Sequence, residues 1–388
     1  MKVISRLLST PRRRAEARAT ARAVGLYLAV AGLGFAVLLL INYHLGRSGS
    51  VLLHRWDSRH YLHIAERGYP SAIPYDSDGQ PEFSTLAFFP LVPALIRALG
   101  WTGLPLAYAG VLVSWCGAAI AAAGIHRLVR ALGGSDAVGY ACVALWACSP
   151  YAFALWVPYS EAVFSAVLVW TLVALISHRW LAAAALCFVA GTVRPTASVL
   201  IGTVVLACGW AALKRRDGWQ PWAALLLAPV GLIANWLFLG AHVGRADGWF
   251  EAERAWGQSF DFGLGTSRVV RRVLFYRHVH GVVDVRNAVV LGLLVLTAIG
   301  VLALALDRRV PWPLVVAVAG AWVLMVGTPG SPLSKPRFML PFLPVLLLLV
   351  ARPLARAPLG VRLCLYGGGA VVSGWYAAGL LVLFEGSP

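Results

Sequence analysis

The sequence contains a run of 19 residues, 23–41, without a charged side chain. A helix of that length, at about 1.5 Å per residue, crosses the roughly 30 Å hydrocarbon core of a bilayer. Similar runs recur along the 388 residues, of which 60% are hydrophobic and 13% charged. Soluble proteins carry about 25% charged residues. We therefore predict an all-α polytopic membrane protein, since each segment in lipid must satisfy its own backbone hydrogen bonds, and we expect no nucleic-acid partner.

Apolar segments bounded by charged and turn residues predict about eleven membrane crossings. The 34-residue stretch 180–213 counts as two crossings, because Arg194-Pro195 interrupts it and one helix would be about 51 Å long. The segment 338–350 contains two prolines and is expected to be bent or thin. The crossings are placed at 23–45, 104–125, 137–157, 160–176, the two halves of 180–213, 222–241, 288–306, 312–327, 338–350 and 363–384.

The distribution of basic residues predicts the orientation of these crossings. With the N-terminus in the cytoplasm, 18 of the 33 basic residues but only 4 of the 16 acidic ones lie in cytoplasmic segments. Topology then accounts for most of the net charge of +17, without a polyanionic ligand. We expect a basic cytoplasmic tail at 1–22 and a single transmembrane domain at 23–388.

Two outer segments, 46–103 and 242–287, are too polar to cross the membrane and too long for simple turns. Function is therefore expected in these two loops. Within the first, residues 61–67 and 88–99 are predicted to form amphipathic helices at the membrane surface.

The densest polar cluster follows the first crossing directly and reads His54-Arg55-Trp56-Asp57-Ser58-Arg59-His60-Tyr61. A carboxylate, cations and aromatic rings would meet there, as they do in catalytic sites. A structural interpretation is equally open: Trp56 and Tyr61 would anchor the interface, and Asp57 would cap a helix or pair with an arginine.

This cluster opens a series of motifs along the chain. Those of the first loop are Arg55-Trp56-Asp57-Ser58, Ile64-Ala65-Glu66-Arg67-Gly68-Tyr69 and Ala87-Phe88-Phe89-Pro90-Leu91-Val92-Pro93. Later fragments are Ser149-Pro150-Tyr151, Pro158-Tyr159-Ser160-Glu161, Thr192-Val193-Arg194-Pro195 and Lys335-Pro336-Arg337-Phe338. In this order the series resembles the motifs of the PIG-V family of GPI mannosyltransferases. The likeness extends from residue 54 to about 345, although over 214–330 we recognise no motif.

The resemblance implies a GT-C glycosyltransferase fold, a polyprenyl-phosphate mannose donor and a glycolipid or glycan acceptor. It further implies a bacterial relative that lies in the plasma membrane, has membrane lipids as partners and has its active site facing outward. Asp57 would be the general base that takes the proton of the attacking hydroxyl, with inversion at the anomeric carbon. One carboxylate suffices, because a polyprenyl phosphate leaves as an anion and needs cations rather than a general acid.

Cations for that phosphate are sought beside prolines at the outer ends of crossings. Arg194, Lys335 and Arg337 have this position, and Arg55 adjoins the predicted base. The alternatives are snorkelling side chains for the first three and a solvated loop charge for Arg55. Substrate contacts are assigned to Trp56, His60, Tyr159 and Glu161. Glu161 has a structural alternative as an acidic first-turn residue behind a Ser160 cap.

Three short patterns could be metal ligands. They are Asp76-Ser77-Asp78, the pair His60 and His63, and the pair His278 and His280. The first is typical of a turn, and neither histidine pair has an identifiable third ligand. No metal or other cofactor is therefore predicted.

Two other classes of function compete with the mannosyltransferase. A lipid or solute transporter would use Arg194 and the broken helix as pathway elements, although no repeated half is evident. A non-catalytic assembly subunit would need no base. Within the enzyme class, a donor carrying another sugar on polyprenyl phosphate fits the same residues.

Overall fold

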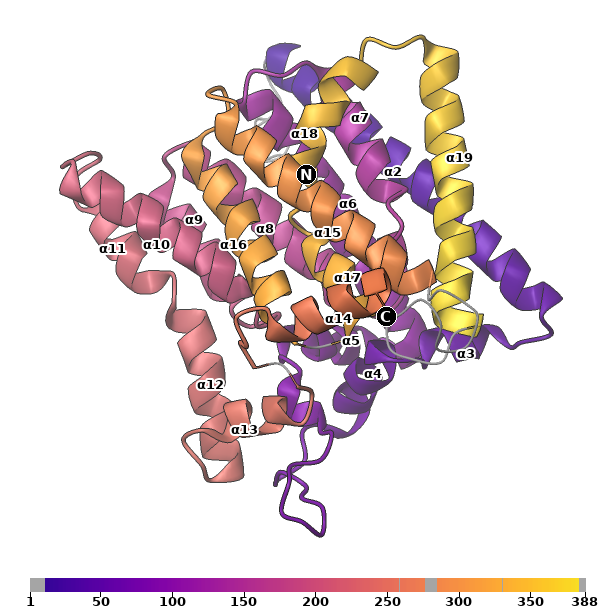
Figure 1. Ribbon diagram of the computed structural model, residues 1–388. Helices are drawn as coiled ribbons and strands as arrows, with labels where there is room; N and C mark the ends of the chain where they lie inside the picture. Colours follow the sequence, from indigo (N-terminus) through magenta and orange to yellow (C-terminus); the bar gives the residue numbers. More distant parts are fainter. Residues whose placement is uncertain (1–10, 258, 276–284, 330, 384–388) are drawn as a thin grey trace.

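The computed structural model describes residues 11–257, 259–275, 285–329 and 331–383, and these ranges are helical apart from turns and one isolated bridge (Figure 1). The helices of the first half are α2 (Pro11–His44), α3 (Gly49–Leu53), α4 (Asp57–Arg67), η1 (Thr85–Ala87), α5 (Leu91–Gly100), α6 (Leu106–Ala131), α7 (Asp136–Ala147), η2 (Ala152–Leu155), α8 (Glu161–Ile176) and α9 (Trp180–Ala190). Those of the second half are α10 (Ala197–Leu213), α11 (Gln220–Leu227), α12 (Val230–Val243), α13 (Gly248–Arg254), α14 (Leu264–Phe275), α15 (Val285–Leu306), α16 (Trp312–Gly327), η3 (Pro332–Ser334), α17 (Lys335–Met339), α18 (Leu343–Leu354), α19 (Leu359–Ala378) and η4 (Gly379–Leu383).

Five helical segments of the described chain are long and apolar enough to span a bilayer: Arg14–His44, Leu106–Ala131, Gln220–Val243, Ala288–Leu306 and Leu359–Val382. The bent pair Pro332–Met339 and Leu343–Leu354 would make a sixth. Six further apolar helices have only 10–17 residues and include α5, α7, α8, α9, α10 and α16. The count of eleven crossings therefore stays a prediction.

Prolines interrupt the helices where the sequence places them in apolar runs. The expected break near Arg194 is confirmed, since α9 ends at Ala190 and α10 begins at Ala197. The expected bend in the 338–350 segment is also confirmed, with an angle of 67° between the two helices of the pair. The expected crossing at 137–157 is α-helical only to Ala147, and the short 3₁₀ helix η2 follows at Ala152–Leu155. Pro150, which is exposed, and Pro158, which is buried, flank η2, because proline cannot continue an α-helical hydrogen-bond ladder.

The two predicted helices of the first loop both form, with shifted starts. The first begins four residues before 61, at Asp57 itself, and the second begins at Leu91, directly after Pro90. A proline at this boundary is favourable because its missing N–H would have no partner there.

The two polar loops lie against each other at one end of the bundle: α13 contacts η1, and Figure 1 shows α13 and α4 at this same lower end. The indole N–H groups of Trp249 and Trp256 donate to the carbonyls of Ala87 (3.4 Å) and Ser84 (3.3 Å). Segments expected in the cytoplasm also meet one another, through ion pairs such as Arg352–Asp307 at 3.0 Å. This grouping agrees with the alternation of loops, while the side of the membrane stays a prediction.

Glycine permits a close approach of α12 to α9. A Cβ atom on Gly231 would overlap the carbonyl oxygen of Phe188, and one on Gly191 would overlap the backbone nitrogen of Leu232. Both glycines therefore allow backbone-to-backbone packing, as small residues do at helix interfaces in membranes.

We expect Gly231→Ala to lower the free energy of unfolding by about 1–3 kcal/mol, because neither backbone can move aside cheaply. Thermal denaturation of the purified protein measures this change. Gly292→Ala on α15 is the matched control, since a Cβ there meets nothing within 4 Å. Equal melting temperatures for the two variants would contradict the packing argument.

Candidate active site

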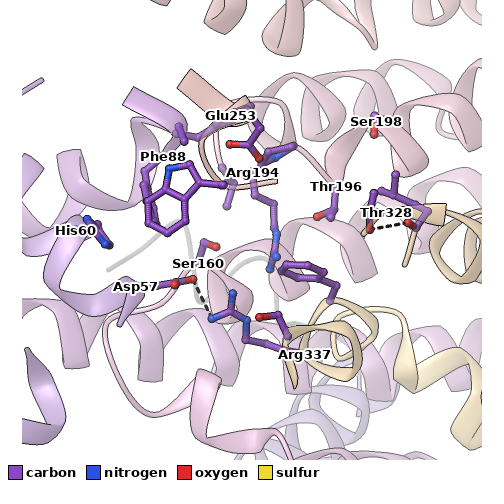
Figure 2. Close-up of a pocket in the computed structure, with 18 of the residues that line it drawn as sticks. Asp57, His60, Phe88, Ser160, Arg194, Thr196, Ser198, Glu253, Thr328 and Arg337 are labelled. Atoms are coloured by element: carbon purple, nitrogen blue, oxygen red, sulfur yellow. Dashed lines mark hydrogen bonds and ion pairs between the residues drawn. The ribbon is translucent and has the colours of Figure 1, made fainter. Parts of the chain in front are cut away.

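A cavity of about 740 Å³ opens where the two polar loops meet the helix bundle (Figure 2). Its walls come from α4, the segment after η1, the turn between α9 and α10, α13, α16 and α17. Polar side chains lining it include Asp57, Ser160, Arg194, Glu253 and Arg337. The remaining lining is largely aromatic and aliphatic.

Four ionisable side chains, alternately acidic and basic, form a chain of ion pairs at the base of this cavity. The Arg337 guanidinium lies 2.8 Å from Asp57 Oδ2 and 3.2 Å from Glu161 Oε1. The Arg194 guanidinium lies 2.9 Å from the same Glu161 oxygen. Glu161 is 1% exposed and both arginines are at most 7% exposed. Two positive and two negative charges cancel, which makes their burial tolerable.

Aromatic rings hold the two arginines in place. The Arg337 guanidinium lies 5.1 Å from the ring centre of Tyr159 and 5.3 Å from that of Phe338. Arg194 lies over Phe338 (5.3 Å) and Phe164 (5.6 Å). Planar guanidinium groups stack on ring faces while their N–H groups bind anions, so both cations are positioned before a ligand arrives.

Asp57 occupies the first position of α4, and an unusual backbone places it there. Trp56, the preceding residue, has φ 51° and ψ −132°, in a region that residues with a side chain rarely adopt. Such strain concentrates at functional sites. Burial raises the pKa of Asp57 above its ordinary value, and Arg337 opposes this shift by stabilising the carboxylate.

An aromatic wall stands beside Asp57. The His60 ring stacks on Phe88 at 4.8 Å and meets the edge of Trp256 at 5.2 Å, and Phe83 contacts Trp256 at 4.9 Å. Burial, aided by the positive charge of Arg59, lowers the pKa of His60 to about 4. His60 is therefore a neutral ring at physiological pH, able to donate or accept a hydrogen bond.

The structure brings together some of the expected phosphate ligands but not all. Arg194 and Arg337 line the cavity. Arg55 does not: its guanidinium donates to the carbonyls of Leu381 (2.7 Å) and Val382 (3.1 Å). Lys335 is also absent from the lining, because its ammonium donates to backbone carbonyls at the end of α16. These two cations satisfy C-terminal helix carbonyls, a position that favours positive charge.

The expected substrate contacts divide in the same way. Trp56 and His60 line the cavity, whereas Tyr159 and Glu161 lie behind the arginines. Ser160 lines the cavity, and its side chain makes no capping hydrogen bond to α8. The interpretation of Ser160 as the cap in front of Glu161 is therefore wrong. Glu161 instead neutralises the two buried arginines.

Sequence reasoning missed several cavity residues in the second half of the chain. Glu253 and Trp256 of the second polar loop line the cavity, as do Leu324 and Thr328 near the end of α16. No motif marks them. The only available signal was an acidic residue flanked by tryptophans, in a loop already expected to carry function.

The two candidate metal patterns that lie in the described residues do not form a metal site. The Asp76 carboxylate accepts the backbone N–H groups of Asp78 (2.9 Å) and Gln80 (2.8 Å), as in a turn. His60 lines the cavity that contains Asp57, whereas His63 lines a separate hollow next to α2 and α6. His278 and His280 lie outside the described residues. Within those residues, no group of three or more His, Cys, Asp or Glu side chains could hold an ion.

Neither a family model nor a curated protein matches the chain. Among solved structures it is similar to ArnT from Cupriavidus metallidurans bound to undecaprenyl phosphate, with a TM-score of 0.50 and 16% identity. The similarity covers 88% of this chain and 62% of the ArnT chain. The protein is thus an integral membrane protein with the GT-C fold. Its resemblance to the PIG-V family stays a prediction.

Proposed function

We propose that this protein is a glycosyltransferase that moves a sugar from a polyprenyl-phosphate donor to an acceptor hydroxyl. The observation that carries the proposal is the cavity in which Asp57 lies beside two buried, aromatic-stacked arginines. The similarity to a GT-C protein whose structure contains undecaprenyl phosphate supports a polyprenyl-phosphate ligand.

The reaction needs one base and an anion site. Asp57 takes the proton of the acceptor hydroxyl as its oxygen attacks the anomeric carbon. The bond from that carbon to the phosphate oxygen breaks, and the electron pair leaves with the phosphate. Arg337 and Arg194 stabilise the charge of the leaving group, and attack opposite to it inverts the anomeric configuration.

The apolar lining suits the lipid part of such a donor. Val199, Leu324, Met325 and Phe342 border the same cavity as the arginines. The first prenyl units would bury apolar surface there, which contributes about 25 cal/mol of favourable free energy per Å² removed from water.

Mannose as the sugar, and a glycolipid or glycan as the acceptor, follow from the resemblance to the PIG-V family. We include both in the proposal as its finer part. The outward-facing site in a bacterial plasma membrane and the absence of a cofactor belong to this finer part as well.

Radiolabel transfer tests the proposal directly. We expect the purified protein in lipid to transfer label from polyprenyl-phosphate mannose into a membrane glycolipid or glycan. Parallel donors carrying glucose or arabinose identify the sugar if mannose fails. Transfer from none of them, together with protein-dependent flux of a lipid or solute across vesicles, would favour the transporter.

A further inference from the structure

Glu253 lines the cavity, and its carboxyl group has no cationic partner among the described residues. Asp57 pairs with Arg337, and buried Glu161 pairs with both arginines, but Glu253 forms no ion pair with any described residue. Glu251, two positions away on α13, pairs with Arg254 at 3.1 Å. A half-buried carboxyl group without a partner is unfavourable unless it is neutral or binds a ligand.

The side chain is aimed at the reaction space. Figure 2 shows the Glu253 carboxyl group pointing into the cavity that also receives Asp57 and Arg194. The segment that carries it is held against the first loop by the hydrogen bonds of Trp249 and Trp256. Glu253 therefore has a defined position relative to the base and the cations.

We propose that Glu253 binds a hydroxyl group of the transferred sugar and so determines which sugar the enzyme accepts. This inference rests on the proposed function. With the acceptor oxygen at Asp57 and the donor phosphate on the cavity side of Arg194 and Arg337, the anomeric carbon lies in the cavity, in front of the Asp57–Arg337 ion pair. The rest of the pyranose ring then extends toward the wall that carries Glu253, Phe88 and Trp256.

The chemistry of this wall fits a sugar ring. A pyranose has apolar C–H faces and a rim of hydroxyl groups, so aromatic rings such as Phe88 and Trp256 cover its face while a carboxyl group binds its rim. Burial, reinforced by the negative charge of Asp57, raises the pKa of Glu253 to about 8. A carboxylic acid that is neutral at pH 7 both donates and accepts a hydrogen bond, which matches a hydroxyl group.

A series of donors tests the contact. The full-length protein in lipid is assayed with the sugar donor found active above and with its 2-, 3-, 4- and 6-deoxy forms. In the wild type we expect one deoxy donor to lose about 10- to 100-fold in kcat/KM, since its partner carboxyl is left unsatisfied. Glu253→Ala should lose a similar factor with the parent donor and show no further loss with that deoxy donor. Glu253→Gln, whose amide also donates and accepts, should stay within about tenfold of the wild type.

Glu251→Gln is the matched control, because it makes the same chemical change on the same helix outside the cavity lining. It should keep the wild-type pattern. The inference would be overturned if Glu253→Ala still lost the full wild-type factor in kcat/KM with every deoxy donor. It would also be overturned if Glu253→Ala changed only the KM for the acceptor. The same loss in Glu251→Gln would also overturn it, since α13 as a whole would then set selectivity. Loss of the proposed function is recognised separately, because the wild type itself would then transfer no sugar, and the inference would fall with it.

Discussion

Replacing Asp57 with asparagine is expected to lower the rate of sugar transfer by about 10²- to 10⁴-fold, the usual contribution of a general base. The amide has nearly the same shape as the carboxylate but cannot take the proton of the acceptor hydroxyl. Donor binding should change much less, because Arg194 and Arg337 both keep Glu161 as a partner. Single-turnover rates of label transfer, measured with saturating donor, separate the two effects.

The pH dependence gives a second measure of the same group. A base acts only when deprotonated, so kcat/KM falls as the pH falls through the pKa of Asp57. Because burial raises that pKa, the loss should begin at a higher pH than for an exposed aspartate, whose pKa is about 3.9.

Asp76→Asn, in the turn of the first loop, is the control for Asp57→Asn and should transfer sugar at the wild-type rate. Normal transfer by Asp57→Asn would refute the assigned base and favour the assembly-subunit hypothesis.

Arg337→Met should have the second large effect, on stability and on catalysis together. Methionine fills much of the same volume, but it leaves the buried Glu161 and the partly buried Asp57 with the single cation Arg194. Removing one member of a buried charge network costs about 3–5 kcal/mol. The site also loses one of its two phosphate ligands, so we expect a fall of at least about 100-fold in kcat/KM.

A double variant separates these two losses. Arg337→Met combined with Glu161→Gln restores charge balance, since Asp57 and Arg194 then remain as one anion and one cation. Its melting temperature should recover most of the way to the wild type, while transfer stays low. Recovery of transfer together with stability would mean that Arg337 serves the fold and not the donor phosphate.

The sequence predicted the features that follow from local composition. Uncharged apolar runs predict membrane helices because lipid offers no partner for backbone polar groups. The breaks near Arg194 and within 338–350 follow from proline chemistry, and both are present. Asp57 was predicted as the base from the motif around it, and the structure places it in the cavity.

The partners of each charge could not be read from the sequence. Arg194, Lys335 and Arg337 lie beside prolines at the ends of apolar segments and Arg55 adjoins Asp57, so all four are candidate phosphate ligands there. Only the fold separates the two that face the cavity from the two that bind helix carbonyls.

The sequence by itself determined that this chain is helical and lies in a membrane, and it placed the candidate catalytic cluster in the first polar loop. Tertiary structure alone decided which distant residues complete the site. Glu161, Arg194 and Arg337 lie far apart along the chain but within ion-pair distance in space. Hydrophobic patterns report which residues enter lipid, because that preference belongs to each segment. Charge pairing depends on how the segments pack, and no single segment contains that information.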